Sequence, residues 1–138
     1  MIRLLATSPI NQSAGVFLVR VAVGCLLVYH GIEVFDSLTM QKYLTWDIFK
    51  NSSGETLVYA GKIMELAAGV LFVLGFCNRL ACVLTIAVMG YITFFVGKGR
   101  FWYEEQHPFL FILLALILFF TGPGKWSLDN VLFDKSRN

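Results

Sequence analysis

Charged side chains are scarce in this sequence. Lys, Arg, Asp and Glu make up 14% of its 138 residues, whereas 57% are hydrophobic. A water-soluble domain of this length cannot bury so much apolar surface, so the composition indicates that a lipid bilayer surrounds the chain. The net charge of +2 and the lack of any basic run argue against nucleic acid as a partner.

Cysteine is also rare. An odd count of three, without CxxC spacing, argues against both a disulfide framework and a metal site. The sequence has no haem ligand pair of clear spacing, no iron–sulfur motif and no nucleotide-binding loop. We therefore expect no metal or haem cofactor, and we expect the thiols to serve as small apolar packing groups: Cys25, Cys77 and Cys82.

The chain does have four long apolar segments, at about 15–34, 56–76, 80–96 and 104–121. Each is long enough, at about 1.5 Å rise per residue, to cross most of a bilayer core of roughly 30 Å. The very short link between the second and third segments requires an antiparallel hairpin. The sequence therefore predicts an all-α, integral membrane four-helix bundle that forms a single membrane domain over residues 1–138.

The remaining connections have the composition of a membrane surface. Residues 35–55 mix apolar and charged side chains, which predicts a short interfacial helix or lid between the first two spans. Residues 97–103 combine glycine, cations and aromatic rings. After the last span, Gly122, Pro123 and Gly124 stop the helix, and an anchoring Lys125–Trp126 pair follows.

Four spans place both termini on the same side of the membrane. Lys and Arg are slightly more numerous on that side, which predicts cytoplasmic termini in a multi-pass protein of a bacterial inner membrane. We read the first span as a retained helix and not as a signal peptide, because no small-residue cleavage site follows it. The five cations assigned to the cytoplasmic side are Arg3, Arg79, Lys125, Lys135 and Arg137.

Ionisable groups inside spans are costly and are functional candidates by default. From their depths, we expect Arg20 in the first span to pair with Glu65 in the second, inside the bundle. This pair could equally be a structural clamp that fixes the register of the two helices, and Arg20 could instead extend to the inner surface. The small residues Gly61, Ala68 and Gly69 predict a close helix contact that would hold Glu65 within the bundle.

Other polar groups converge on the opposite half of the membrane. His30 and Glu33 share a helix face, Lys62 lies three residues before Glu65, and His107 starts the fourth span. We expect an apolar pocket suited to a quinone head group, with a histidine donating to a quinone carbonyl and a glutamate exchanging the proton. We expect four aromatic residues to close it: Tyr29, Tyr59, Trp102 and Tyr103.

The predicted catalytic residues are His30 and Glu65. The predicted quinone-binding residues are Arg20, His30, Glu33, Tyr59, Lys62, Glu65 and His107. Glu33, Glu104 and Glu105 could alternatively lie in the lipid headgroup region, and which of Glu104, Glu105 and His107 faces the bundle stays open.

Several dispersed motifs together resemble the DoxX family of small four-span membrane proteins. They are an arginine-bearing first helix that ends in His30–Gly31, an acidic second helix with a turn to Arg79, and the segment Gly122–Asp129. The resemblance implies quinone-linked redox chemistry, as in subunits of quinol oxidases and of thiosulfate:quinone oxidoreductases. It marks four positions: Arg20, His30, Glu65 and Arg79.

Three functions follow as hypotheses. The first is a quinone-interacting redox subunit that exchanges electrons with a partner protein. As an enzyme, this class would be a thiosulfate:quinone-type oxidoreductase, with this chain as one subunit. The second is a non-catalytic scaffold or assembly factor for a redox partner. The third is a small-solute transporter, which four unbroken spans without inverted repeats would support only in a homo-oligomer.

Overall fold

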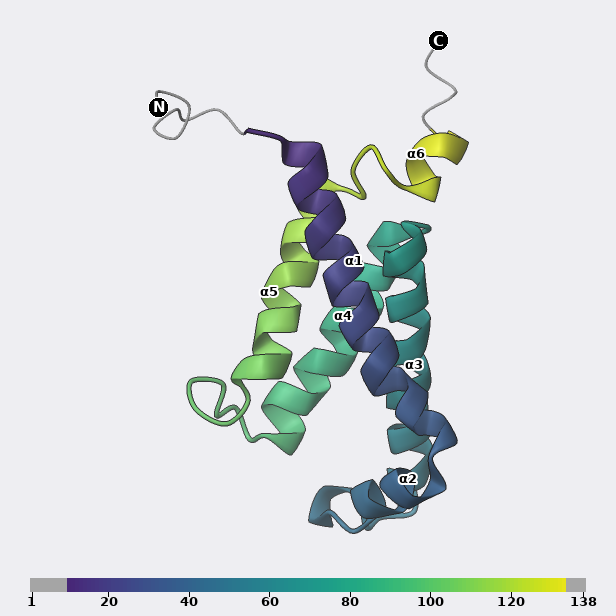
Figure 1. Ribbon diagram of the computed structural model, residues 1–138. Coiled ribbons are helices and arrows are strands. Elements are labelled where there is room, and N and C mark those ends of the chain that lie inside the picture. The colour runs from purple at the N-terminus through teal and green to yellow at the C-terminus, as the bar shows by residue number, and fades with distance from the viewer. Residues whose placement is uncertain (1–9, 134–138) are drawn as a thin grey trace.

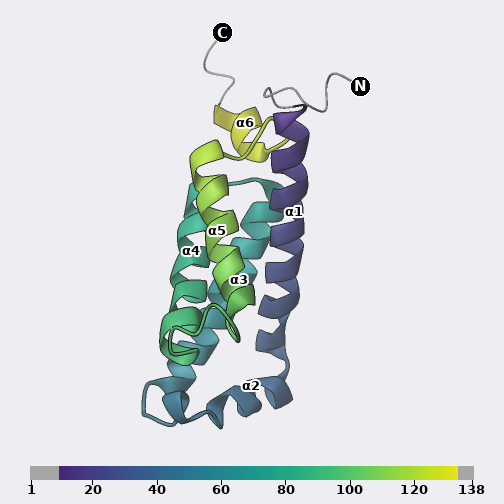
Figure 2. The ribbon, with the colours of Figure 1, turned by 90° about the vertical axis from the view of Figure 1, so that its left-hand side faces the viewer.

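A computed structural model describes residues 10–133 of the chain. Three helical segments in it are long and apolar enough to cross a membrane, Gln12–Phe35, Gly54–Leu74 and Asn78–Val96, and the fourth apolar helix is shorter, Gln106–Thr121. The four stand side by side and alternate in direction, as the two perpendicular views show (Figures 1 and 2). The predicted fold class, an all-helical membrane bundle, is confirmed.

The first long helix and the connection after it are positioned by side-chain caps. α1 (Gln12–Gly31) begins where the Asn11 side chain accepts a hydrogen bond from Ala14 N at 3.1 Å. A 3₁₀ turn, η2 (Ile32–Phe35), extends it. Asp36 then caps α2 (Ser37–Leu44), because its carboxylate accepts from Leu38 N at 3.1 Å. α2 and the 3₁₀ turn η3 (Asp47–Phe49) lie across the end of the bundle away from α6 (Figure 1).

Glycine geometry then reverses the chain between the next two helices. α3 (Gly54–Leu74) ends at Gly75, whose φ of +65° is the left-handed conformation that glycine adopts readily. α4 (Asn78–Tyr91) starts three residues later, so the predicted hairpin is present, although α4 begins two residues before the predicted position. A π-helical turn, η4 (Ile92–Val96), continues α4.

The fourth long helix, α5 (Gln106–Thr121), ends at Gly122 with φ +76°, and the short α6 (Leu128–Phe133) follows. Residues 104 and 105, predicted to be helical, belong to the preceding loop. Arg3, Lys135 and Arg137, which were used to predict orientation, lie outside the described residues. The start of α1 and α6 lie at the same end of the bundle, as an even number of spans requires (Figure 1).

The bundle core is apolar and tightly packed. Its fully buried side chains include Leu27, Phe72, Cys82, Ala115 and Leu118. α1 and α3 approach closely at Gly24, Gly31 and Gly69, where an added Cβ would meet backbone of the facing helix. The predicted small-residue contact is therefore right for Gly69 and wrong for Gly61, which has open space beside it.

Candidate functional site

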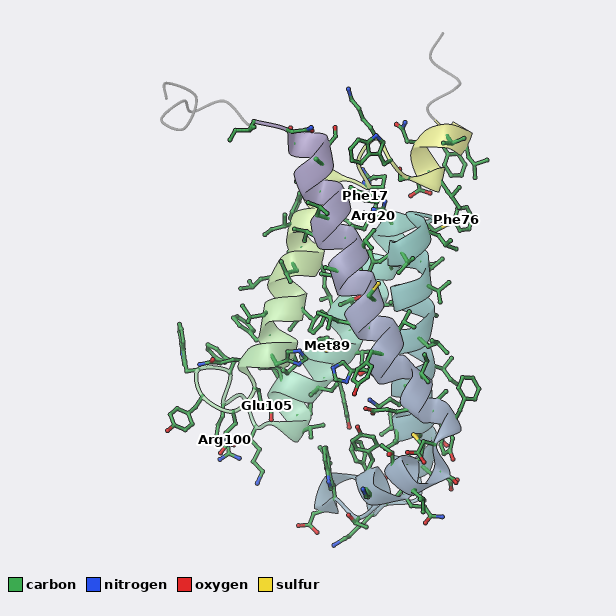
Figure 3. The ribbon with its side chains drawn as sticks, in the orientation of Figure 1. Phe17, Arg20, Phe76, Met89, Arg100 and Glu105 are labelled. Carbon is green, nitrogen blue, oxygen red and sulfur yellow. The ribbon has the colours of Figure 1, made fainter. Side chains whose placement is uncertain are left out.

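The buried charges form two separate groups, one at each end of the bundle, and the expected Arg20–Glu65 pair is absent. Arg20 is 1% exposed, and its guanidinium donates to the carbonyl oxygens of Phe72, of Val73 at 3.3 Å and of Trp126 at 2.6 Å (Figure 3). Glu65 instead forms an ion pair with Lys62 at 3.0 Å. The prediction was wrong because backbone carbonyl oxygens, here near the end of α3 and just before α6, can satisfy an arginine as well as a carboxylate can.

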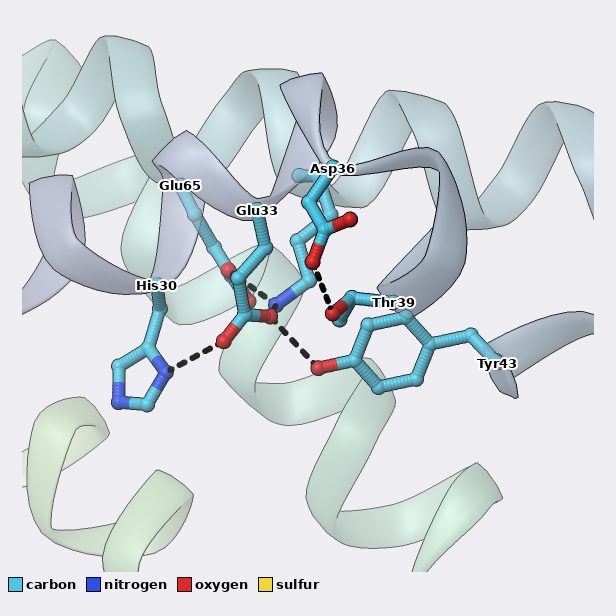
Figure 4. Close-up of polar contacts among 7 residues, drawn as sticks. His30, Glu33, Asp36, Thr39, Tyr43 and Glu65 are labelled. Atoms are coloured by element: carbon cyan, nitrogen blue, oxygen red, sulfur yellow. Dashed lines mark hydrogen bonds and ion pairs between the residues drawn. The ribbon is translucent and has the colours of Figure 1, made fainter. Parts of the chain in front are cut away.

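Lys62 is the centre of the second group. Its ammonium lies 2.9 Å from Glu33 Oε2 and 3.0 Å from Glu65 Oε2, so that one cation joins η2 to α3 (Figure 4). The side chains of Lys62 and Glu65 are only 11% and 4% exposed. Two carboxylates therefore share one lysine, and every charged group of this cluster lies beside a group of opposite charge.

Two further residues extend this group. The Tyr43 hydroxyl donates to Glu33 Oε2 at 2.6 Å, and Lys62 Nζ lies 4.9 Å from the centroid of the Tyr43 ring. Burial, followed by the hydrogen bond to Glu33, raises the pKa of Tyr43 above its ordinary value. His30 Nδ1 lies 3.8 Å from Glu33 Oε1 on the other side, as Figure 4 shows.

A cavity of about 340 Å³ adjoins this group, and we call it the α2 cavity. Its polar lining comprises His30, Lys62, Glu65, Glu105 and His107. The His30 and His107 rings are 5.5 Å apart, which brings α1 and the start of α5 together at the cavity. Glu104, in contrast, is exposed and pairs with Arg100 at 2.8 Å, whereas Glu105 at the end of this loop and His107 in the first turn of α5 line the cavity.

The apolar lining of the α2 cavity comes from the segment between the first two spans and from the middle of the bundle. Tyr43, Trp46 and Phe49 form the wall contributed by α2 and η3. The opposite wall is formed by residues of α3, α4 and η4, among them Gly61, Val88, Met89, Tyr91 and Ile92. The predicted lid between the first two spans therefore contributes directly to the site.

The aromatic residues expected to close the pocket do not line it. Tyr29, Trp102 and Tyr103 are 71%, 79% and 88% exposed, and none of them is part of the lining. Tyr59 lies on an exposed face of α3 outside the cavity. Sequence reasoning missed the aromatic wall formed by Tyr43, Trp46 and Phe49. The only sequence pattern that pointed to it was the mixture of apolar and charged side chains in residues 35–55.

The end of the bundle near α6 has no part in the α2 cavity, yet it contains the other marked positions. Arg20 stabilises the C-terminal segment there, and Arg79 is exposed at the start of α4. Asp129 accepts hydrogen bonds from Cys77 N at 2.7 Å and Asn78 N at 2.9 Å, and so caps α4 from a segment some 50 residues away. Through these contacts the segment Gly122–Asp129 is joined to Arg20 of α1 and to the start of α4, which indicates a structural role. We call this segment the clasp.

Sequence comparisons place this architecture among known proteins. The DoxX family model matches residues 15–98, which contain most of α1, the α2 segment, α3 and α4. An uncharacterised protein of Haemophilus influenzae is 25% identical over 123 residues, covering 84% of this chain and 89% of that protein. No solved structure matches. This match covers more than half of the chain and includes the contacting residues His30, Glu33, Tyr43, Lys62 and Glu65. On this evidence the chain is a multi-pass membrane protein of the DoxX family.

Proposed function

We propose that the chain binds a quinone head group in the α2 cavity and acts as the quinone-interacting subunit of a redox system in a bacterial inner membrane, with its termini in the cytoplasm. The observation that carries the proposal is an apolar cavity of about 340 Å³ with His30, Lys62 and Glu65 gathered in its lining. Ligand pockets are typically of this kind, mostly apolar with a few convergent polar groups.

The polar groups have the chemistry that a quinone requires. The Lys62 ammonium has three protons, of which two face carboxylates, so a third can be donated to a quinone carbonyl oxygen. His30 turns Nδ1 toward Glu33, and when the ring is doubly protonated its other ring nitrogen can also donate to the quinone. Glu65, Glu33 and the two histidines can hold or release protons at the site.

A bound quinone would accept two electrons and two protons on reduction to a quinol. The groups around Lys62 supply the protons and a partner protein supplies the electrons, as in the thiosulfate:quinone oxidoreductases that the family resemblance implies. The chain's own residues bind and orient the head group, while the Tyr43, Trp46 and Phe49 wall limits access of water.

Purification in a mild detergent tests the proposal. We expect a copurified or added quinone to be retained and to show the ultraviolet difference between its oxidised and borohydride-reduced forms. Gly61→Leu should remove binding, because the side chain would project into the open space of the cavity. Gly90→Leu is the matched control, since an added Cβ there also meets nothing within 4 Å and the residue does not line the cavity.

Two outcomes of this experiment would contradict the proposal. One is that the unaltered protein binds no quinone, and the other is that Gly61→Leu binds quinone as well as the unaltered protein does. Retention of a redox enzyme in a pull-down without any quinone binding would favour the scaffold function instead.

A further inference from the structure

A second hollow lies at the opposite end of the bundle, between the start of α1, the start of α4, the end of α5 and α6. We call it the α6 groove, and its volume is about 890 Å³. We propose that it binds the head group of an acidic phospholipid, with the lipid phosphate held between Arg79 and Lys125. The proposal is independent of quinone binding, because the two sites share no residue.

The charge of the groove favours a phosphate. Arg79 and Lys125 are both exposed on its lining, and within residues 10–133 neither forms an ion pair or a side-chain hydrogen bond. The guanidinium of Arg79 lies 5.9 Å from the centroid of the Phe119 ring, which restrains it beside the groove. Among the described residues, Asp129 is the only carboxylate of the lining, and both of its oxygens already accept backbone N–H groups. Within residues 10–133, the groove thus presents two available cations and no carboxylate oxygen without a hydrogen bond.

The depth of the groove favours a lipid over a soluble anion. It lies where the apolar helices α4 and α5 begin and end, which is the level of the headgroups. Trp126, which is 57% exposed, follows Lys125 directly, as expected of a residue at the membrane interface. Basic pockets between membrane helices are a common type of site for anionic lipid head groups.

An apolar track leads from the groove toward the bilayer core. Leu80 lines the groove, and Val83 follows three residues later on the same face of α4. The two side chains are 51% and 53% exposed, so an acyl chain can lie along them while the phosphate stays in the groove. Gln12 and Ser13, also in the lining, can bond to the hydroxyl groups of a glycerol head group. These features together select phosphatidylglycerol over a lipid without net charge.

Native mass spectrometry of the delipidated protein tests this assignment. Phosphatidylglycerol, phosphatidylcholine and inorganic phosphate are each added at equal concentration. We expect one phosphatidylglycerol to be retained with at least a tenfold preference over phosphatidylcholine. Arg79→Gln/Lys125→Gln should reduce that retention at least tenfold. Lys42→Gln/Lys98→Gln is the matched control, because it removes the same charge from exposed positions at the other end of the bundle and should change nothing.

Three outcomes would overturn the proposal. These are equal retention of the two lipids, equal retention of phosphatidylglycerol by the Arg79→Gln/Lys125→Gln variant, and equal displacement by inorganic phosphate, which would mean a simple anion site. Leu80→Ser supplies a second arm. It should weaken lipid retention and leave any binding of inorganic phosphate unaltered, and circular dichroism of each variant verifies that the helices are intact.

Discussion

The Arg20 guanidinium lies 2.6 Å from the carbonyl oxygen of Trp126, a residue 106 positions later in the chain. The same guanidinium binds the carbonyl oxygens of Phe72 and Val73, which are near the end of α3. One buried side chain therefore fastens the first helix, the end of the second span and the C-terminal segment to one another. Hydrogen bonds from a charged donor contribute more than those between neutral groups, at about 1.5–3 kcal/mol each.

Arg20→Met should accordingly lower the free energy of unfolding by about 2–5 kcal/mol, because three hydrogen bonds from a charged donor are lost. Unfolding in sodium dodecyl sulfate, followed by circular dichroism, measures the change. Trypsin should also cleave after Lys125 faster in this variant, since Trp126 is no longer held. Arg100→Met, which removes an exposed pair with Glu104, should change stability by less than about 1 kcal/mol. Equal stability of the two variants would contradict this role for Arg20.

The two glycines Gly31 and Gly61 should respond oppositely to alanine. A Cβ on Gly31 would collide with the backbone of Leu66, so Gly31→Ala should separate α1 from α3 at a cost of about 1–3 kcal/mol. A Cβ on Gly61 meets nothing within 4 Å, and alanine favours a helix by up to about 1 kcal/mol over glycine. Thermal unfolding in detergent should therefore show a lower Tm for Gly31→Ala and an equal or higher Tm for Gly61→Ala. The reverse order would show that the helix contact is misplaced.

The group around Lys62 should behave as a coupled unit. Lys62→Met leaves the 4%-exposed Glu65 without its cation, and loss of one partner from a buried pair costs about 3–5 kcal/mol. Lys62→Met/Glu65→Gln should recover a large part of that loss, because the more deeply buried of the two carboxylates is then neutral, while the more exposed Glu33 keeps its hydrogen bond from Tyr43. A double-mutant cycle in dodecyl sulfate unfolding gives the coupling energy. Strictly additive losses would mean that the two side chains do not interact.

Tyr43 should make stability depend on pH in the alkaline range. Its pKa is raised in the folded protein, first by burial and then by the hydrogen bond to Glu33, so the folded state favours the neutral phenol. The stabilisation is complete below the ordinary tyrosine pKa of about 10, and it is lost as the pH rises from there through the raised value. Between pH 9 and 11, Tm should fall more steeply for the unaltered protein than for Tyr43→Phe. The exposed Tyr103→Phe variant is the control, and it should follow the unaltered protein.

The sequence was sufficient to predict the helices but not all of the contacts between them. Apolar runs closed by Gly75 and Gly122 locate the helix ends to within about three residues, because local geometry decides them. The convergence of His30, Lys62 and His107 on one half of the membrane also follows from depth alone, and the structure places all three on the α2 cavity.

What escaped prediction depends on the backbone path and not on residue type. The partner of Arg20 is a set of carbonyl oxygens, which every residue has and no sequence pattern marks. The wall formed by Tyr43, Trp46 and Phe49 depends on how α2 and η3 lie across the end of the bundle. The carboxylate of Asp129 reaches the start of α4 only because the clasp brings it there.

Trp46 permits the most direct test of quinone binding, because it lines the α2 cavity while Trp102 and Trp126 do not. A Trp102→Phe/Trp126→Phe protein retains Trp46 as its single tryptophan, and its fluorescence can be titrated with a short-chain quinone in detergent. We predict saturable quenching that is abolished by Gly61→Leu and preserved in Gly90→Leu. Quenching that never saturates, or that is the same in both leucine variants, would contradict a quinone site in the α2 cavity.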